Sequence, residues 1–82
     1  MDIKIEKLNS VEDVKDYISL LIDNGLAYHF DDVIGDDFVC ARPLTGDQIK
    51  IMESNRLKMW KIVDLWKLME DEPELYGRLK DS

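Results

Sequence analysis

The chain has little of what stabilises most small secreted proteins or anchors proteins in membranes. Its 82 residues include one cysteine, Cys40, which excludes an internal disulfide and favours a reducing, cytoplasmic compartment. No stretch approaches the ~20 apolar residues that cross a bilayer, and the first residues lack the apolar run of a cleaved signal. With only four glycines and two prolines, long irregular segments are not expected. We therefore expect a cytoplasmic protein with no membrane partner, folded as a single small domain over 1–82.

The excess of negative over positive charge is confined to one part of the chain. Residues 12–47 hold nine acidic and two basic residues, so this segment alone carries the formal charge of −7 of the whole chain. A concentrated anionic surface repels nucleic acids and attracts basic surfaces or cations. The basic residues of the C-terminal half are matched by acids and give no net basic face. Direct nucleic-acid binding is therefore not expected.

The clearest helix is predicted over residues 10–24. Ser10 is a favourable N-cap with Asp13 three residues later, and Gly25 provides the C-terminal stop. One face is apolar at the helical spacing i, i+3, i+4, i+7 and i+8, comprising Val14, Tyr17, Ile18, Leu21 and Ile22. We expect this face to pack into the core.

A long helix is predicted over 45–70, starting with a capping-box pattern at Thr45 and Gln48. Asp64 offers an alternative boundary, because its side chain could cap a new turn. The long helix is apolar over more than half its circumference, with a broad face of Ile49, Met52, Met59, Trp60, Val63 and Trp66 beside a flank of Ile51, Ile62, Leu65 and Met69. Such a helix is either clamped between two layers or presents part of its surface to a partner, including a second copy of the chain.

The remaining segments are shorter. Residues 72–80 are predicted as a short C-terminal helix that docks through Leu75, Tyr76 and Leu79. Residues 2–8 alternate polar and apolar side chains, which is typical of an edge strand or an extended arm. Residues 26–44 are predicted as a small β-hairpin or an extended acidic loop. The fold class is mainly α, with α+β as the alternative if these segments pair.

Part of the chain resembles a known group of proteins. From Leu21 to Asp32, a helix ends at Gly25 and is followed by an aromatic–His–aromatic triplet and two aspartates. Together with the later Trp60…Trp66 and Asp71–Tyr76 patterns, this resembles small acidic proteins of bacteriophages and prophages, in which Pro often stands where this chain has Leu65. The resemblance implies a mobile-element origin and an inhibitor of host defence or a modulator of host enzymes. Those relatives are mostly of unknown function, so it assigns no site residue.

The acidic stretch after residue 26 supplies the candidate partner-binding site. Aromatic side chains anchor protein interfaces, and charges at the rim steer encounter. The residues that combine these properties are Tyr28, His29, Phe30, Asp31, Asp32, Asp36 and Asp37. The same imidazole and four carboxylates could instead bind a divalent cation, although Val33 and Phe38 interrupt EF-hand spacing. In a third interpretation, the aromatic rings fill the core and the aspartates are simply solvated.

No constellation in the sequence specifies a reaction. Cys40 lacks the electropositive neighbours that activate a thiol, and the four glycines are isolated, so no phosphate-binding loop is present. No Cys/His spacing suits zinc. We expect no cofactor and a non-enzymatic acidic protein that binds a basic surface of a host or defence protein in the host cytoplasm. If that surface is a nucleic-acid-binding groove, the carboxylates would stand in for phosphates, which is mimicry of the anti-CRISPR or anti-restriction type. The alternatives are a divalent-metal-responsive module and a homo-oligomeric accessory protein.

Overall fold

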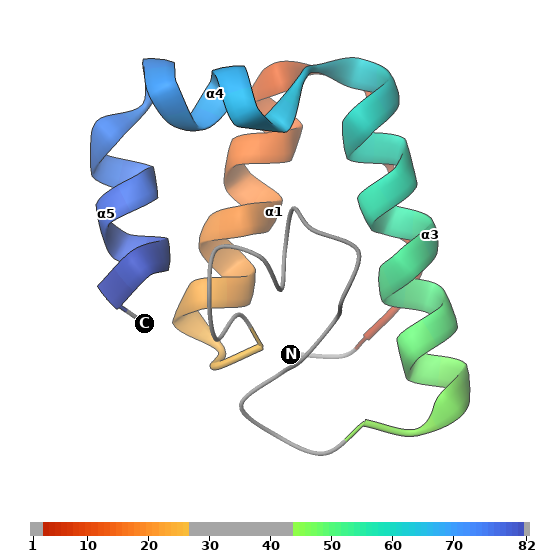
Figure 1. Cartoon of the computed structure of the whole chain (residues 1–82). Helices are drawn as coiled ribbons and strands as arrows, with labels where there is room; N and C mark the ends of the chain where they lie inside the picture. The colour runs from red at the N-terminus through yellow and green to blue at the C-terminus, as the bar shows by residue number, and fades with distance from the viewer. Residues whose placement is uncertain (1–2, 27–43, 82) are drawn as a thin grey trace.

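The computed structural model describes residues 3–26 and 44–81. An irregular arm precedes α1 (Val11–Asp23), and α3 (Gly46–Ile62), α4 (Leu65–Asp71) and α5 (Pro73–Asp81) follow. In Figure 1, α1 lies between α3 and α5, and α4 crosses one end of the molecule to join them. The mainly helical class is confirmed, and the arm forms no strand within the described part. The predicted hairpin or acidic loop falls almost wholly on 27–43, outside the described residues.

Helix α1 forms where the sequence predicted it. The Ser10 Oγ accepts a hydrogen bond from the Asp13 amide at 3.2 Å, and the Asp13 carboxylate accepts one from the Asn9 amide at 3.0 Å. These bonds satisfy amides that a helix start leaves without intrahelical partners. Four of the five predicted face residues are buried and the fifth packs against them partly exposed: Val14, Tyr17, Ile18, Leu21 and Ile22.

The end of α1 depends on Gly25. Its φ of +68° lies in the left-handed region, which a glycine adopts without steric cost. The Leu26 amide then donates to the Leu21 carbonyl at 2.8 Å, and the Gly25 amide to the Ile22 carbonyl at 3.2 Å. This is a Schellman motif, and it returns the buried Leu26 to the core beside Leu21. The predicted stop at Gly25 is confirmed.

The prediction of one continuous helix over 45–70 is wrong, and the alternative boundary at Asp64 is right. Val63 has extended backbone angles of φ −152° and ψ 150°. The Asp64 side chain accepts hydrogen bonds from the amides of Trp66 at 3.0 Å and Lys67 at 3.4 Å, which starts α4. After the break, Leu65 and Met69 of the predicted apolar flank are buried, together with Leu68.

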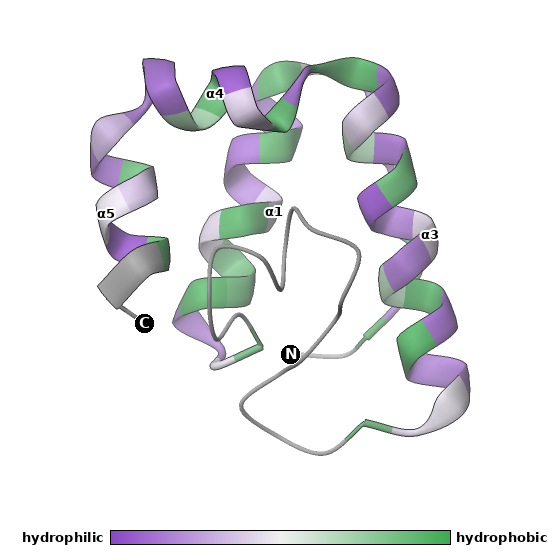
Figure 2. Cartoon of the chain, in the orientation of Figure 1, coloured by the Kyte–Doolittle hydropathy of each residue, from purple (hydrophilic) through white to green (hydrophobic). Residues whose placement is uncertain are grey.

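Helix α3 buries only part of the face that its apolar pattern predicts, together with polar residues that the pattern did not include. Met52 and Met59 are buried as expected, but Ile49 is exposed, and so is Trp66 beyond the break. Figure 2 shows hydrophilic and hydrophobic residues alternating along α3 without a continuous apolar stripe. The reason is that the buried side of α3 includes the polar Asn55, which the pattern did not mark as inward-facing.

A single hydrophobic core joins the helices. Helix α1 contacts both α3 and α5, and α4 packs on α5. Leu75 and Leu79 dock α5 as predicted, whereas Tyr76 remains partly exposed at 38 %. The side chains that form the core come from all four described helices and from the turn after α1: Val14, Tyr17, Ile18, Leu21, Leu26, Met52, Met59, Leu65, Leu68, Met69, Leu75 and Leu79.

Asn55 attaches the N-terminal arm to the bundle. Its side chain is 1 % exposed. The amide oxygen accepts from the Glu6 amide at 3.0 Å, and Nδ2 donates to the Lys4 carbonyl at 2.9 Å and to the Tyr17 hydroxyl at 3.1 Å. One turn later, Lys58 Nζ donates to the Glu6 carbonyl at 3.1 Å. The arm is therefore held by hydrogen bonds to its main-chain groups, as it would be if it paired with a neighbouring strand.

We predict that Asn55→Ala lowers the free energy of unfolding by about 2–4 kcal/mol, because it leaves two main-chain groups and a buried hydroxyl without their partner. Amide hydrogen exchange at Glu6 should accelerate in the same variant. Chemical denaturation and exchange measured by NMR test both effects. Ser54→Ala, on the same helix turn, is the control and should change stability by less than about 0.5 kcal/mol. Equal stability of the two variants would contradict the role assigned to Asn55.

The Asp64 cap generates a second prediction. Asp64→Ala should destabilise the protein by about 1 kcal/mol, the usual cost of losing an N-cap, whereas Asp64→Ser should retain most of the stability because its hydroxyl can accept the same bonds. Thermal or denaturant unfolding of the two variants measures the difference. If Ala and Ser are equivalent at this position, the side chain does not act as a cap.

Candidate functional site

The predicted partner-binding residues lie outside the part of the chain that the structure describes. This applies to all seven: Tyr28, His29, Phe30, Asp31, Asp32, Asp36 and Asp37. The alternative metal site uses five of the same residues, so it too lies outside. Among residues 3–26 and 44–81, no group of three or more His, Cys, Asp or Glu side chains is placed to hold a metal ion. No helix in the described ranges has the length and apolar character needed to cross a membrane.

The described portion of the anionic segment 12–47 lies at the surface. Asp16 and Asp47 are exposed and form no ion pair with any residue in the described ranges, whereas Glu12 and Asp23 each pair with a basic side chain. Asp13 is used by the start of α1. Some of the carboxylates counted in the sequence are therefore already engaged within the molecule, and Asp16 and Asp47 are the described ones most open to a partner.

Two sets of polar contacts connect α1 to the C-terminal helices. Lys15 Nζ lies 2.8 Å from a Glu12 carboxylate oxygen and 3.0 Å from one of Glu72, which caps the end of α4. At the other end, Arg78 of α5 lies 2.6 Å from the Asp23 carboxylate. Arg78 also donates to the hydroxyl of Ser19 at 3.3 Å. The Asp23 carboxylate of α1 thus helps to position α5 and also adds negative charge to the surface.

Two groups have pKa values that differ from their ordinary ones. Hydrogen bonds to Glu12 first and Glu72 second raise the pKa of Lys15 above its ordinary 10.5. Burial raises the pKa of the Tyr17 hydroxyl above its ordinary 10.0, the Asn55 hydrogen bond opposes this effect, and the charge of Glu6 adds to it. Both shifts favour the form present at neutral pH, namely a charged lysine and a neutral tyrosine.

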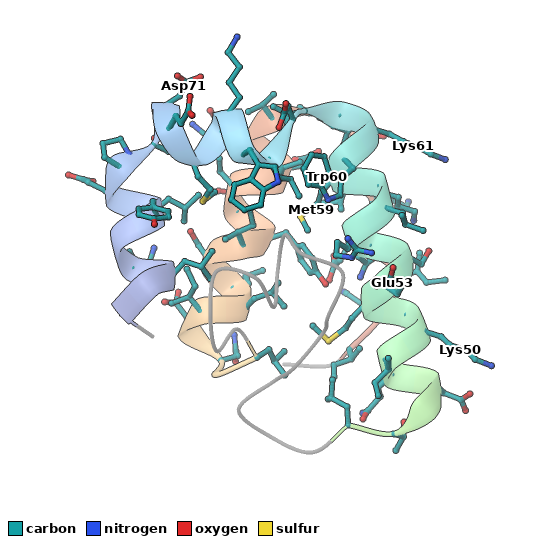
Figure 3. All side chains as sticks on the ribbon, in the orientation of Figure 1. Lys50, Glu53, Met59, Trp60, Lys61 and Asp71 are labelled. Carbon is teal, nitrogen blue, oxygen red and sulfur yellow. The ribbon has the colours of Figure 1, made fainter. Side chains whose placement is uncertain are left out.

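The predicted methionine and tryptophan face is divided by the fold. Figure 3 shows Met59 and Trp60 pointing toward the interior, while Lys50 and Lys61 project from the outer side of α3. Met52 and Met59 are buried, so they cannot contact a second copy of the chain. Among Met52, Met59, Trp60 and Trp66, Trp66 keeps the largest exposed fraction, 52 %.

Trp66 lines a hollow at the junction of α4 and α5. The hollow has a volume of about 460 Å³ and opens to solvent, and its surface is mostly apolar. The described residues that line it are Trp66, Met69, Glu70, Pro73 and Tyr76. We refer to this feature as the α4–α5 hollow. It combines two partly exposed aromatic rings with a carboxylate, and it lies outside the anionic segment.

Sequence reasoning missed the hollow because Trp66 was placed on the broad face of one continuous helix and Tyr76 was expected to dock on the core. The signal was present in the spacing, since Trp66, Met69, Glu70 and Pro73 follow i, i+3, i+4 and i+7. An acid within an otherwise apolar row indicates a row that reaches solvent. The helix boundary at Asp64 must be known before this row can be separated from the face of α3.

The raised pKa values predict a loss of stability in alkaline solution. A group whose pKa is higher in the folded state stabilises the protein below its unfolded pKa and loses this contribution as pH rises toward the folded pKa. The free energy of unfolding should therefore fall above pH 10.0, the ordinary tyrosine value. Denaturant unfolding at several pH values measures the slope. In Tyr17→Phe the slope should be shallower, and an unchanged slope would contradict the assignment to Tyr17.

No protein-family model matches the chain, and no curated protein or solved structure gives a match.

Proposed function

We propose that this chain is a non-enzymatic acidic binding protein of phage or other mobile-element origin, which inhibits or modulates a host or defence protein. It engages a basic surface of that protein through the anionic segment 12–47. The observation that carries the proposal is the location of the charge, because this single segment accounts for the whole formal charge of −7. The resemblance of Leu21–Asp32 to small acidic phage proteins supports the origin.

The exposed carboxylates of the described part support an electrostatic mode of binding. Asp16 and Asp47 lie at the surface without an ion pair among the described residues. Glu12 and Asp23 are paired, but their side chains remain largely exposed, and exposed pairs contribute only about 0–1 kcal/mol. A partner's lysine or arginine can therefore compete for them. The four aspartates after Phe30 add four negative charges within seven residues of the same segment, with no basic residue among them.

If the basic surface of the partner is a nucleic-acid-binding groove, the carboxylates take the place of phosphates. Phosphate contacts dominate the affinity of such grooves and are strongly salt-dependent. A protein that presents carboxylates to the same lysines and arginines competes with DNA or RNA without binding either. Enzymatic activity in the chain itself is not required for this form of inhibition.

The salt dependence of binding tests the proposal. A basic host protein captured by this chain at low salt should be purified, and its dissociation constant measured as the salt concentration rises. We expect the affinity to fall steadily, and duplex DNA to compete for the same partner. An affinity that stays constant up to ~1 M salt, where the Debye length is ~3 Å, would rule out electrostatic engagement.

Charge-matched variants locate the binding segment. Asp16→Asn/Asp47→Asn removes two charges from the anionic segment, and Asp2→Asn/Glu6→Gln removes two charges outside both this segment and the α4–α5 hollow. The first pair should weaken binding more than the second, and replacing Asp31, Asp32, Asp36 and Asp37 by Asn should weaken it further. Equal effects of the two double variants would show that net charge alone, and not this segment, governs binding.

A further inference from the structure

We propose that the α4–α5 hollow binds an arginine side chain of a basic protein partner. The site lies outside the anionic segment, so this proposal stands whether or not segment 12–47 binds the same partner. The aromatic rings of Trp66 and Tyr76 provide surfaces on which a guanidinium group can stack, and Glu70 provides the opposite charge.

The apolar surface of the hollow comes from one continuous row. Trp66, Met69 and Glu70 lie on one face of α4, and Pro73 carries the row into α5, where Tyr76 follows one turn later. Met69 is buried and forms part of the core, so the hollow has a fixed base. Trp66 and Tyr76 keep 52 % and 38 % of their surface exposed.

The charges around the hollow select a cation. Four acids lie between residues 70 and 74, and only Glu72 among them has an ion pair with a described residue, Lys15. Glu70, Asp71 and Glu74 are exposed, and Figure 3 shows Asp71 directed away from the bundle at the α4 end. Arg78, the basic residue of α5 closest to this junction in sequence, is turned to Asp23 of α1. An anionic ligand would be repelled at this junction.

The mixture of apolar lining and negative charge favours arginine over lysine. A guanidinium group is planar and weakly hydrated, so it stacks on aromatic faces while pairing with a carboxylate. An ammonium group is strongly hydrated and loses more on entering an apolar hollow. A neutral apolar side chain would gain the aromatic contact but leave Glu70 without a charge partner.

The experiment uses the full chain labelled with ¹⁵N and a short capped peptide that carries one arginine beside a leucine. The matched peptide contains citrulline, which has nearly the same shape as arginine but no charge. NMR titration follows the indole resonance of Trp66, which is identified by its absence in Trp66→Phe. We expect a saturable shift with the arginine peptide and binding weaker by about threefold or more with citrulline, in line with one cation–aromatic contact and one exposed ion pair.

Two single-charge variants then separate the hollow from the net charge. Glu70→Gln should weaken binding of the arginine peptide by about two- to fivefold, whereas Glu6→Gln, which removes the same charge on the N-terminal arm, should leave it unchanged. Equal binding of the two peptides, or equal weakening by the two variants, overturns the proposal. No saturable Trp66 shift up to about 10 mM peptide also overturns it, because a contact of this kind is expected in the millimolar range.

Discussion

The buried amide of Asn55 is the interaction on which the arrangement of the molecule depends. It joins three parts of the chain, since α3 provides the side chain, α1 provides the Tyr17 hydroxyl, and the arm provides main-chain groups at Lys4 and Glu6. A domain of this size buries a limited fraction of its surface, so each such connection matters for stability. A buried amide is costly unless it is satisfied, and here both of its donor hydrogens and its oxygen have partners. The same residue therefore specifies one position for the arm.

The break between α3 and α4 explains how the C-terminal half buries more apolar side chains than one straight helix could. A straight helix over 45–70 would leave either its face or its flank in water. The extended Val63 and the Asp64 cap redirect the chain, so that α4, which carries Leu65 and Met69 of the flank, packs on α5, while α3 packs on α1. Trp66, in the first turn of α4, remains exposed to solvent after this change of direction. The exposed tryptophan and the compact core thus have the same structural origin.

Local sequence signals predicted the helix ends well and the long-range contacts poorly. Ser10, Gly25 and Thr45 act within a few residues of their own position, and the structure places all three as caps or stops. The buried side of α3 could not be predicted in this way, because the burial of Asn55 depends on main-chain groups about fifty residues earlier in the chain. The exposure of Trp66 and Tyr76 depends on the break before α4. The candidate loop site rests on composition alone, since its residues lie outside the described ranges.

The ion pairs on α1 determine how α5 would respond if a basic partner of the proposed kind binds. Asp23 pairs with Arg78 of α5, and Lys15 pairs with Glu72, the residue just before α5. A cation of the partner that replaces Arg78 or Lys15 would remove a contact that positions α5. Thermodynamic linkage then requires the converse, so that loosening α5 would make these carboxylates more available. Under the proposal, the binding of the partner and the docking of the last helix are coupled equilibria.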